Sequence, residues 1–485
     1  MKYSEVKNYI NGQFVENGSG RKLDVVSPID GNLLSTVPMS SGTDLDTAVM
    51  SAKKAFPAWS KTPIKERVQV FFRYKYLLEK HLTELAELCS EENGKTLGEA
   101  TAEIEKCIEL TEFACSLPQL VTGEVLEVSR GVECRTEHVA LGVVASIVPF
   151  NFPSMVPNWT LPNAIALGNC MIMKPSEKVP LSVGRLAELL KEAGLPDGVF
   201  NVVHGDVDIV EAICDHPDIQ AVSFVGSTKV AKIVYKRATS NYKRCLALGG
   251  AKNHLIVLPD AKPDMTAQNV AASMSGCAGQ RCMAASAMIG VGNIDDIINK
   301  ICDEARKIVP GKNLGPVINK QSQEKIEKYI TEAESQGAKI LVDGRNTKVN
   351  GKESGTYVGP TVIDYVKPGM SVATEEIFGP VISIMRTNTV DEALTIENAN
   401  PYGNAASVFT QNGGMARYII DRASAGMIGV NVGVPVPREP FSFGGWNESK
   451  FGVGDITGKS SIEFWTKLKK STTKWNSEAG VNWMS

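Results

Sequence analysis

The 485-residue chain predicts an α/β fold with two parallel-sheet domains, and three observations carry this prediction. The chain is longer than the roughly 250–300 residues that a single hydrophobic core usually supports. From residue 143 onward, short apolar runs alternate with amphipathic stretches, as in strands joined by crossover helices. A second series of the same kind begins near residue 255. Because such sheets bind ligands beyond the carboxyl ends of their strands, we expect a site there.

The N-terminal third predicts short strands followed by helices. Asn11-Gly12, between two apolar pairs, indicates a β-hairpin. The Val-rich residues 118–139 are expected to form strands that leave the main body. Helices are predicted over residues 43–56, 64–92 and 96–116.

The two series of apolar runs give the expected strands. The first series places strands at 143–148, 171–173, 199–203 and 221–225, with helices near 154–167, 181–194 and 207–214. The second series includes strands at 255–258, 339–342, 381–385, 405–409 and 427–432. In the tail, 462–475, a further strand is expected at Ile462-Glu463-Phe464-Trp465.

Composition and charge are those of a globular protein and exclude several classes of binding partner. A hydrophobic fraction of 43% and a charged fraction of 22% are ordinary for a globular protein. The net charge of −3 provides no basic field for nucleic acid or acidic lipid, so neither partner is expected. A polar N-terminus and the absence of a long apolar run favour a cytoplasmic protein. The ten cysteines contain no CxxC pair and the five histidines, His204 and His254 among them, show no ligand spacing, so no metal is expected.

A stretch of small residues, 274–288, contains the candidate nucleophile. Cys277 and Cys282 lie five residues apart, and Arg281 directly precedes the second thiol. A cationic, partly exposed setting favours the thiolate, so we interpret Cys282 as the nucleophile and Cys277 as a packing residue. The alternative is that both are buried small hydrophobes, which the stretch alone would favour.

Three further segments stand in order around that stretch. They are Pro149-Phe150-Asn151-Phe152-Pro153, Phe224-Val225-Gly226-Ser227-Thr228 and Glu375-Glu376-Ile377-Phe378-Gly379-Pro380. Together with Gly279-Gln280-Arg281-Cys282, they resemble the aldehyde dehydrogenase superfamily over essentially the whole chain. The resemblance implies an aldehyde dehydrogenase-like α/β fold in three parts. These are a Rossmann-type NAD-binding domain (1–118 and 140–250), an α/β catalytic domain (251–445) and a small β oligomerisation arm (119–139 and 460–485).

The resemblance also implies catalytic roles. The Cys282 thiolate would attack the aldehyde carbonyl, and hydride transfer would convert the adduct into a thioester. The Asn151 side-chain amide and the Cys282 backbone N–H would stabilise the oxyanion. Read without the other segments, Asn151 would be a simple turn residue.

NAD is the cofactor that the resemblance implies. A carboxylate at Glu177 would accept hydrogen bonds from the ribose and repel a 2′-phosphate, which favours NAD over NADP. Outside this context, Lys174 and Glu177 would be a solvated charge pair. One departure is Ala231, where family members commonly have a second glycine after Gly226. The implied cofactor-binding residues are Phe150, Lys174, Glu177, Gly226, Ser227, Glu376 and Phe378.

The acyl acceptor is predicted from an absent carboxylate. Hydrolytic members carry a glutamate base upstream of the cysteine, and the corresponding position here is Ala247 or Leu248; no Asp or Glu lies between Asp218 and Asp260. Since a positioned base contributes roughly 10²–10⁴-fold, water should attack the thioester slowly, and coenzyme A is the expected acceptor. The strings Gly-Ala-Lys-Asn-His, Gly-Gln-Arg-Cys-Met-Ala and Gly433-Val434-Pro435-Val436-Pro437 look like the CoA-acylating methylmalonate-semialdehyde dehydrogenase branch.

That branch oxidises malonate or methylmalonate semialdehyde and forms acetyl-CoA or propionyl-CoA with loss of CO₂. The resemblance places Arg281 and Lys106 at the substrate carboxylate, although lysine replaces the branch's arginine at 106 and loses its bidentate geometry. Lys106 could equally be a surface residue. One alternative is a hydrolytic NAD-dependent aldehyde dehydrogenase that gives a free acid from another short semialdehyde. Another is a non-catalytic protein that kept the fold. A homodimer or homotetramer is implied.

Overall fold

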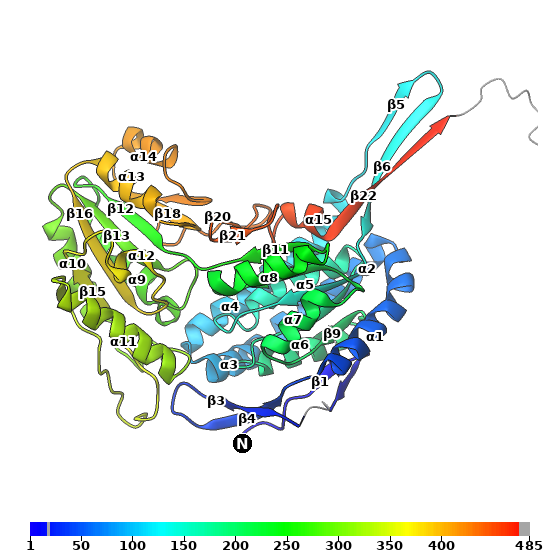
Figure 1. Cartoon of the computed structure of the whole chain (residues 1–485), viewed down its shortest axis with the longest axis horizontal. Helices are drawn as coiled ribbons and strands as arrows, with labels where there is room; N and C mark the ends of the chain where they lie inside the picture. The colour runs from blue at the N-terminus through cyan, green and yellow to red at the C-terminus, as the bar shows by residue number, and fades with distance from the viewer. Residues whose placement is uncertain (17–19, 475–485) are drawn as a thin grey trace, which may run out of the picture.

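The computed structural model describes residues 1–16 and 20–474 and has two α/β halves with a projecting arm (Figure 1). One half is built on an eight-stranded sheet and the other on a seven-stranded sheet, and three strands form the arm. The predicted α/β class is confirmed. Among the described residues, no helix is long and apolar enough to cross a membrane.

The first sheet has the order β2-β1-β9-β8-β7-β10-β11-β21, and strands β7 to β11 run parallel. The chain leaves β7 toward β8 and β9 on one side and returns to β10 and β11 on the other, so the strand order reverses beside β7 and opens a crevice there. The predicted hairpin joins β1 to β2 through Asn11 and Gly12, both at positive φ. The strands are β1 (Asn8–Ile10), β2 (Gln13–Val15), β7 (Val143–Ile147), β8 (Cys170–Lys174), β9 (Phe200–Val202), β10 (Ile219–Val225), β11 (Arg244–Leu248) and β21 (Lys450–Phe451).

Helices cover both faces of this sheet. One layer contains α1, α7 and α8, and the other contains α5 and α6 with α2, α3 and α4 packed outside them. The helix expected over 64–92 is two helices, because the backbone at His81 (φ −103°, ψ 16°) leaves helical geometry. The helices are α1 (Gly42–Lys61), α2 (Ile64–Lys80), α3 (Leu82–Asn93), α4 (Leu97–Leu120), α5 (Met155–Ala166), α6 (Leu181–Glu192), α7 (Val207–Asp215) and α8 (Thr228–Ser240).

The second sheet has the order β14-β15-β16-β13-β12-β18-β19, and β14 is its antiparallel edge. Separate apolar cores fill its two faces, one under α9 and α10 and the other under α11 to α14. The strands are β12 (Asn253–Val257), β13 (Ala285–Val291), β14 (Lys339–Val342), β15 (Thr361–Asp364), β16 (Val381–Thr387), β18 (Ala405–Phe409) and β19 (Met427–Val430). The helices are α9 (Pro263–Ser275), α10 (Asp295–Arg306), α11 (Lys320–Ser335), α12 (Ser371–Thr374), α13 (Val390–Ala399) and α14 (Gly413–Ile420).

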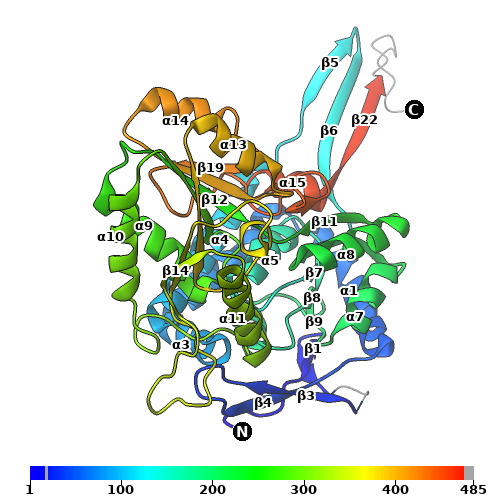
Figure 2. The ribbon, with the colours of Figure 1, turned by 60° about the vertical axis from the view of Figure 1, so that its left-hand side comes forward.

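The arm leaves the main body as an antiparallel sheet of β5 (Val125–Ser129), β6 (Val132–Ala140) and β22 (Thr466–Lys474) (Figure 2). The strand expected at Ile462–Trp465 is wrong, because these residues form the helix α15 (Ser460–Trp465). Ile462 and Trp465 lie three residues apart. The helix buries both side chains, whereas a strand would point them to opposite faces of the sheet. Residues 475–485, which the sequence also assigned to the arm, lie outside the described residues.

Two small sheets and the 3₁₀ helix η1 (Gly276–Gly279) complete the described elements. A β-hairpin, β3 (Lys22–Val26) and β4 (Leu33–Pro38), lies below the first half in Figure 1. The short strands β17 (Tyr402–Gly403) and β20 (Trp446–Asn447) pair with each other. From β20 the chain enters β21, so the segment after residue 445 returns to the first sheet.

Candidate active site

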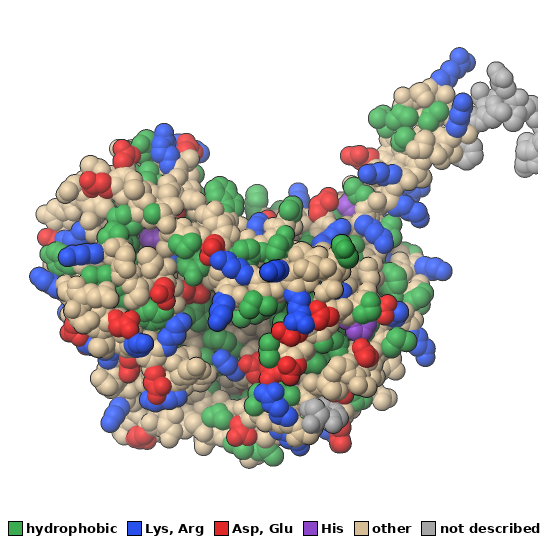
Figure 3. Space-filling model, viewed as in Figure 1, with side chains coloured by type: hydrophobic (Ala, Val, Ile, Leu, Met, Phe, Trp, Pro, Cys, Tyr) green, Lys and Arg blue, Asp and Glu red, His purple; other side chains and the backbone are tan. Residues whose placement is uncertain are grey.

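Cys282 lies where two cavities meet. The surface is hollowed between the two halves of the molecule (Figure 3), where a cleft of about 550 Å³ opens at the carboxyl ends of the first sheet. A second chamber of about 460 Å³ lies under the loop that follows β19. Phe152, Trp159 and Cys282 line both cavities. A molecule in either cavity would therefore have access to the same sulfur atom.

Two asparagines hold the backbone of Cys282 at the amino ends of the second sheet. Asn253 Nδ2, at the start of β12, donates to the carbonyl oxygens of Cys282 (2.7 Å) and Ala284 (2.9 Å). Asn404 Nδ2, directly before β18, donates to the same Cys282 oxygen at 2.9 Å. Neither asparagine was predicted from the sequence. The only signal was a polar residue at the edge of an otherwise apolar strand.

The turn before Cys282 has an unusual backbone. Cys277, Ala278 and Gly279 all have positive φ, which costs energy for the two residues that carry a Cβ. The Cys277 N–H donates to Glu99 Oε1 at 2.5 Å, and a Cβ at Gly279 would stand 2.0 Å from the Gly379 carbonyl oxygen. Cys277 itself is buried. The turn is thus fixed by contacts to a helix of the first half and to the segment before β16.

The half-buried Cys282 thiol lies in surroundings that disfavour its thiolate form. Burial and the nearby Glu376 carboxylate raise its pKa to about 12, although Arg281 and the backbone N–H groups of Cys282 and Met283 lower it. Arg281 therefore favours the thiolate, as expected, but burial outweighs its effect. The Arg281 guanidinium donates to the carbonyl oxygens of Ala272 (3.0 Å) and Ser273 (3.3 Å), at the end of α9, so its charge is partly engaged elsewhere.

Asn151 lies opposite this turn and is buried. Its side-chain Nδ2 donates to the Gln280 carbonyl oxygen at 2.9 Å, which leaves one of its two N–H bonds for a ligand. Asn93 Nδ2 donates to the neighbouring Phe150 carbonyl oxygen at 2.9 Å. Asn151 and Cys282 line the same cleft. The structure therefore brings together the two residues for which the sequence suggested catalytic roles.

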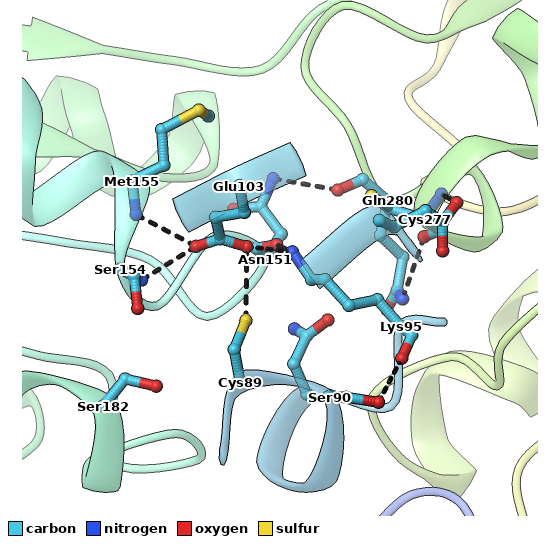
Figure 4. Close-up of polar contacts among 12 residues, drawn as sticks. Cys89, Ser90, Lys95, Glu103, Asn151, Ser154, Met155, Ser182, Cys277 and Gln280 are labelled. Atoms are coloured by element: carbon cyan, nitrogen blue, oxygen red, sulfur yellow. Dashed lines mark hydrogen bonds and ion pairs between the residues drawn. The ribbon is translucent and has the colours of Figure 1, made fainter. Parts of the chain in front are cut away.

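A buried ion pair supports the Asn151 segment (Figure 4). Lys95 Nζ pairs with the Glu103 carboxylate and donates to the Asn151 carbonyl oxygen at 2.9 Å. Both side chains have no exposed surface. Glu103 also accepts hydrogen bonds from the backbone N–H groups of Ser154 (2.8 Å) and Met155 (2.9 Å), where α5 begins. This pair was not predicted from the sequence; its signal was a carboxylate at helical spacing among the apolar residues of α4.

The cleft wall holds the residues predicted to bind the cofactor. Lys174 is buried and lies 3.4 Å from Glu177, and burial lowers the pKa of its ammonium group. The rings of Phe150 and Phe378 meet edge to face with centroids 5.9 Å apart. Gly226 and Ser227 lie at the start of α8, where no side chain caps the first N–H groups. Ala231, which replaces the family's second glycine, is buried in α8.

Glu376 completes that wall from the second half. Its carboxylate is buried and accepts a hydrogen bond from the Ala251 N–H at 3.1 Å. Burial raises its pKa to about 7, against the lowering effect of Lys325 and Lys252. A Cβ at Gly250 would stand 2.4 Å from the same carboxylate, so only glycine allows this approach.

The two positions that could have carried a general base are apolar and buried. Ala247 and Leu248 lie in β11. Among the described residues, the carboxylates that line the two cavities come from other elements. These are Glu177, Asp206 and Glu376 in the cleft and Glu109 and Glu439 in the chamber.

The chamber contains both residues predicted to bind the substrate carboxylate. Arg281 and Lys106 line it together with apolar side chains from α5 and from the loop after β19. Within the part of the chain that the structure describes, Arg281 Nε is buried without a hydrogen-bond partner. Lys106, in contrast, is paired with Glu439 at 2.6 Å.

Comparison with known proteins identifies the family. The model of the aldehyde dehydrogenase family matches residues 14–471, so the chain belongs to this family. The predicted resemblance and the predicted fold are both confirmed.

Three similar proteins lie within this family. A malonate-semialdehyde dehydrogenase of Geobacillus kaustophilus is 44% identical over 97% of this chain and 99% of its own length. The mitochondrial acylating methylmalonate-semialdehyde/malonate-semialdehyde dehydrogenase of Mus musculus is 43% identical over 98% of this chain and 90% of its own. The crystal structure of a Sinorhizobium meliloti protein with bound NAD superposes on this chain with a TM-score of 0.97. The two chains are 41% identical, and the superposition covers 99% of each.

Proposed function

We propose that this chain is a CoA-acylating, NAD-dependent dehydrogenase of malonate or methylmalonate semialdehyde that forms acetyl-CoA or propionyl-CoA with loss of CO₂. The observation that carries the proposal is a sulfur nucleophile between two cavities with no carboxylate at position 247 or 248. The names of the similar dehydrogenases from Geobacillus kaustophilus and Mus musculus support the same substrate class.

In the first half-reaction, the Cys282 sulfur attacks the aldehyde carbon and the carbonyl oxygen becomes an oxyanion. The free N–H of the Asn151 amide and the Cys282 backbone N–H stabilise that charge. Because burial raises the pKa of the resting thiol to about 12, the proton has to leave to solvent before the sulfur attacks, and the positive charge of bound NAD would favour that loss. Collapse of the oxyanion releases hydride and leaves an acyl thioester on Cys282.

The cleft fits NAD, which would accept that hydride when bound. Its crevice lies where the strand order reverses, and the uncapped N-terminus of α8 offers N–H groups to a pyrophosphate. Lys174 and Glu177 would hold the adenosine ribose, and Glu376 the nicotinamide ribose. The rings of Phe150 and Phe378 would border the nicotinamide. The NAD complex of the Sinorhizobium meliloti protein supports this choice of cofactor.

In the second half-reaction, the acyl group leaves Cys282. A thioester that carries a β-carboxylate loses CO₂ when its enolate is stabilised, and the N–H donors of Asn151 and Cys282 that bound the oxyanion can stabilise it. Protonation of the enolate carbon then gives an acetyl or propionyl thioester. The coenzyme A thiolate attacks the thioester carbonyl, the C–S bond to Cys282 breaks, and acyl-CoA forms.

Product analysis tests the proposal. The purified protein is given malonate semialdehyde and NAD, with and without coenzyme A, and the products are identified by mass spectrometry. We expect acetyl-CoA and CO₂ with coenzyme A and only slow turnover without it. Free acid formed at full rate in the absence of coenzyme A would contradict the proposal.

A hydrolytic dehydrogenase is the second candidate, and one observation favours it. The charge of Glu376 raises the pKa of Cys282, so a carboxylate does act on the sulfur. With a pKa of about 7, Glu376 could accept a proton from water. In that case, Glu376→Gln would abolish formation of free acid even at saturating NAD, whereas CoA-dependent turnover at saturating NAD would persist, since it does not need this base.

The arm and the location complete the proposal. Apolar side chains of the arm are exposed, namely Val125, Leu126, Val128 and Leu468. Such a patch on a projecting sheet favours a homodimer or homotetramer formed through the arm. Leu126→Lys should lower the mass measured by light scattering.

A cytoplasmic location fits free thiols and coenzyme A as co-substrate.

A further inference from the structure

The substrate chamber contains an ion pair that joins α4 to the loop above the chamber. Lys106 Nζ, on α4, lies 2.6 Å from Glu439 Oε2 and 3.2 Å from Glu109 Oε1. The Lys106 side chain is 19% exposed and that of Glu439 only 8%. Because water reaches this pair so little, the charge of Glu439 is screened far less than it would be on the surface.

Glu439 weakens the attraction between Lys106 and the carboxylate of a substrate. A carboxylate that approaches the ammonium group meets a second carboxylate already bound there, and like charges at such a distance repel. A half-buried ammonium group is costly without a close counter-charge, and Glu109 is farther away and more exposed (37%), so the site without substrate benefits from Glu439. A substrate carboxylate and Glu439 therefore compete for the same cation.

Arg281 provides the second contact in the chamber. Its Nη2 donates to carbonyl oxygens at the end of α9, but its Nε–H is buried without an acceptor in the described part of the chain. A carboxylate could satisfy that donor without displacing any protein group. Arg438 also lines the chamber, so its cations are Arg281 with an open donor, Lys106 that is already paired with Glu439, and the exposed Arg438.

We propose that Glu439 is a specificity-determining residue that holds Lys106 in the empty site, yields it to the carboxylate of the bound semialdehyde and pairs with it again after CO₂ has left. This inference rests on the proposed function for its substrate. After decarboxylation the acyl group carries no negative charge, so Glu439 restores the balance that the lost carboxylate provided. Neutral aldehydes never compete for Lys106.

The first test is Glu439→Gln, which keeps the shape and hydrogen-bonding oxygen but removes the charge. We expect the KM for malonate semialdehyde to fall about tenfold, while the KM for propanal changes less than about twofold. Glu79→Gln removes a carboxylate from the exposed Lys75–Glu79 pair outside both cavities and is the matched control. An equal change for both aldehydes would overturn the inference.

The second test measures anion binding without turnover. Malonate in the chamber should protect Cys282 from alkylation by iodoacetamide, and the half-protecting concentration should fall about tenfold in Glu439→Gln. In a protein that already carries Lys106→Met, adding Glu439→Gln should not lower the half-protecting concentration of malonate. Unchanged or weaker protection in Glu439→Gln would refute the role of Glu439. If protection shifts as expected but the wild-type protein makes no acyl-CoA, the proposed function fails and the competition for Lys106 stands.

Discussion

The two halves of the molecule present opposite edges of their sheets to the active site. The first sheet contributes residues that follow its parallel strands: Asn151 comes after β7, and Gly226 after β10. The second sheet contributes residues that precede its strands: Cys282 comes before β13, and Glu376 before β16. The rule that ligands bind beyond the carboxyl ends of strands therefore describes only the first half.

The difference has an electrostatic consequence. At the first edge, α8 begins, and its unpaired N–H groups favour an anion. At the second edge, α9 ends beside the nucleophile, and the carbonyl oxygens there occupy the Arg281 guanidinium. A sulfur atom at this edge gains no help from a helix N-terminus, which agrees with its raised pKa. The helix N-terminus that favours a pyrophosphate and the nucleophile therefore belong to different edges, and at the second edge a substrate carboxylate would depend on side-chain cations such as Arg281.

The largest expected effect comes from the nucleophile of the second edge. Cys282→Ser should lower kcat/KM by about 10⁴-fold or more, because a hydroxyl replaces the sulfur that forms the thioester. NADH formation measured by absorbance checks this value. Cys277→Ser is the control, since this thiol is buried in packing, and a loss below about tenfold is expected. Equal losses of kcat/KM in both variants would mean that the activity depends on the shape of the turn and not on the Cys282 sulfur.

The next effect is on the stability of the first edge. Lys95→Met leaves the buried Glu103 carboxylate without its cation, so we expect a loss of about 3–5 kcal/mol in the free energy of unfolding. Urea denaturation provides the measurement. Lys75→Met removes a lysine from the exposed pair with Glu79 and should cost less than about 1 kcal/mol. If the two variants were equally stable, the buried pair would not support the Asn151 segment.

The second edge uses neutral amides in place of a charged pair, so its loss should be smaller. Asn253→Ala leaves the Cys282 and Ala284 carbonyl oxygens without this donor and should cost about 1–3 kcal/mol in the free energy of unfolding. Asn241→Ala, on the surface at the end of α8, is the matched control and should change little. A loss as large as that of Lys95→Met would remove the contrast between the two edges.

The sequence predicted more of the first edge than of the second. Local patterns placed Asn151 and Gly226 directly after predicted strands, but their roles came from the resemblance carried by four segments together, since Asn151 alone would be a simple turn residue. The supports of Cys282 could not be predicted, because Asn253 and Asn404 are 151 residues apart and meet only through the pairing of β12 with β18. Burial is equally invisible in a local pattern, so the thiol's raised pKa was missed. The helix break at His81 and the helix at 460–465 depend on tertiary packing in the same way.

The smallest expected effect is a pH dependence where the two edges meet. Burial raises the pKa of Glu376 to about 7, so this carboxyl group is mostly protonated at pH 6 and ionised at pH 8. In the proposed mode of NAD binding, the nicotinamide ribose needs this carboxylate as acceptor. The affinity for NAD should therefore be about tenfold weaker at pH 6 than at pH 8.

Calorimetric titration of NAD between pH 6 and pH 8 measures this dependence. The Ala251 N–H, Lys325 and Lys252 lower the pKa of Glu376, and Glu376 in turn raises the pKa values of Cys282 and Tyr402. Burial lowers the pKa of Lys252 itself to about 7, so its charge also changes in this range. Lys252→Met should move the midpoint to higher pH, because the nearby cation is lost. Glu376→Gln should bind NAD more weakly and with the same affinity at both pH values. A pH dependence that survives in Glu376→Gln would assign it to another group and leave the second edge without a role in holding the cofactor.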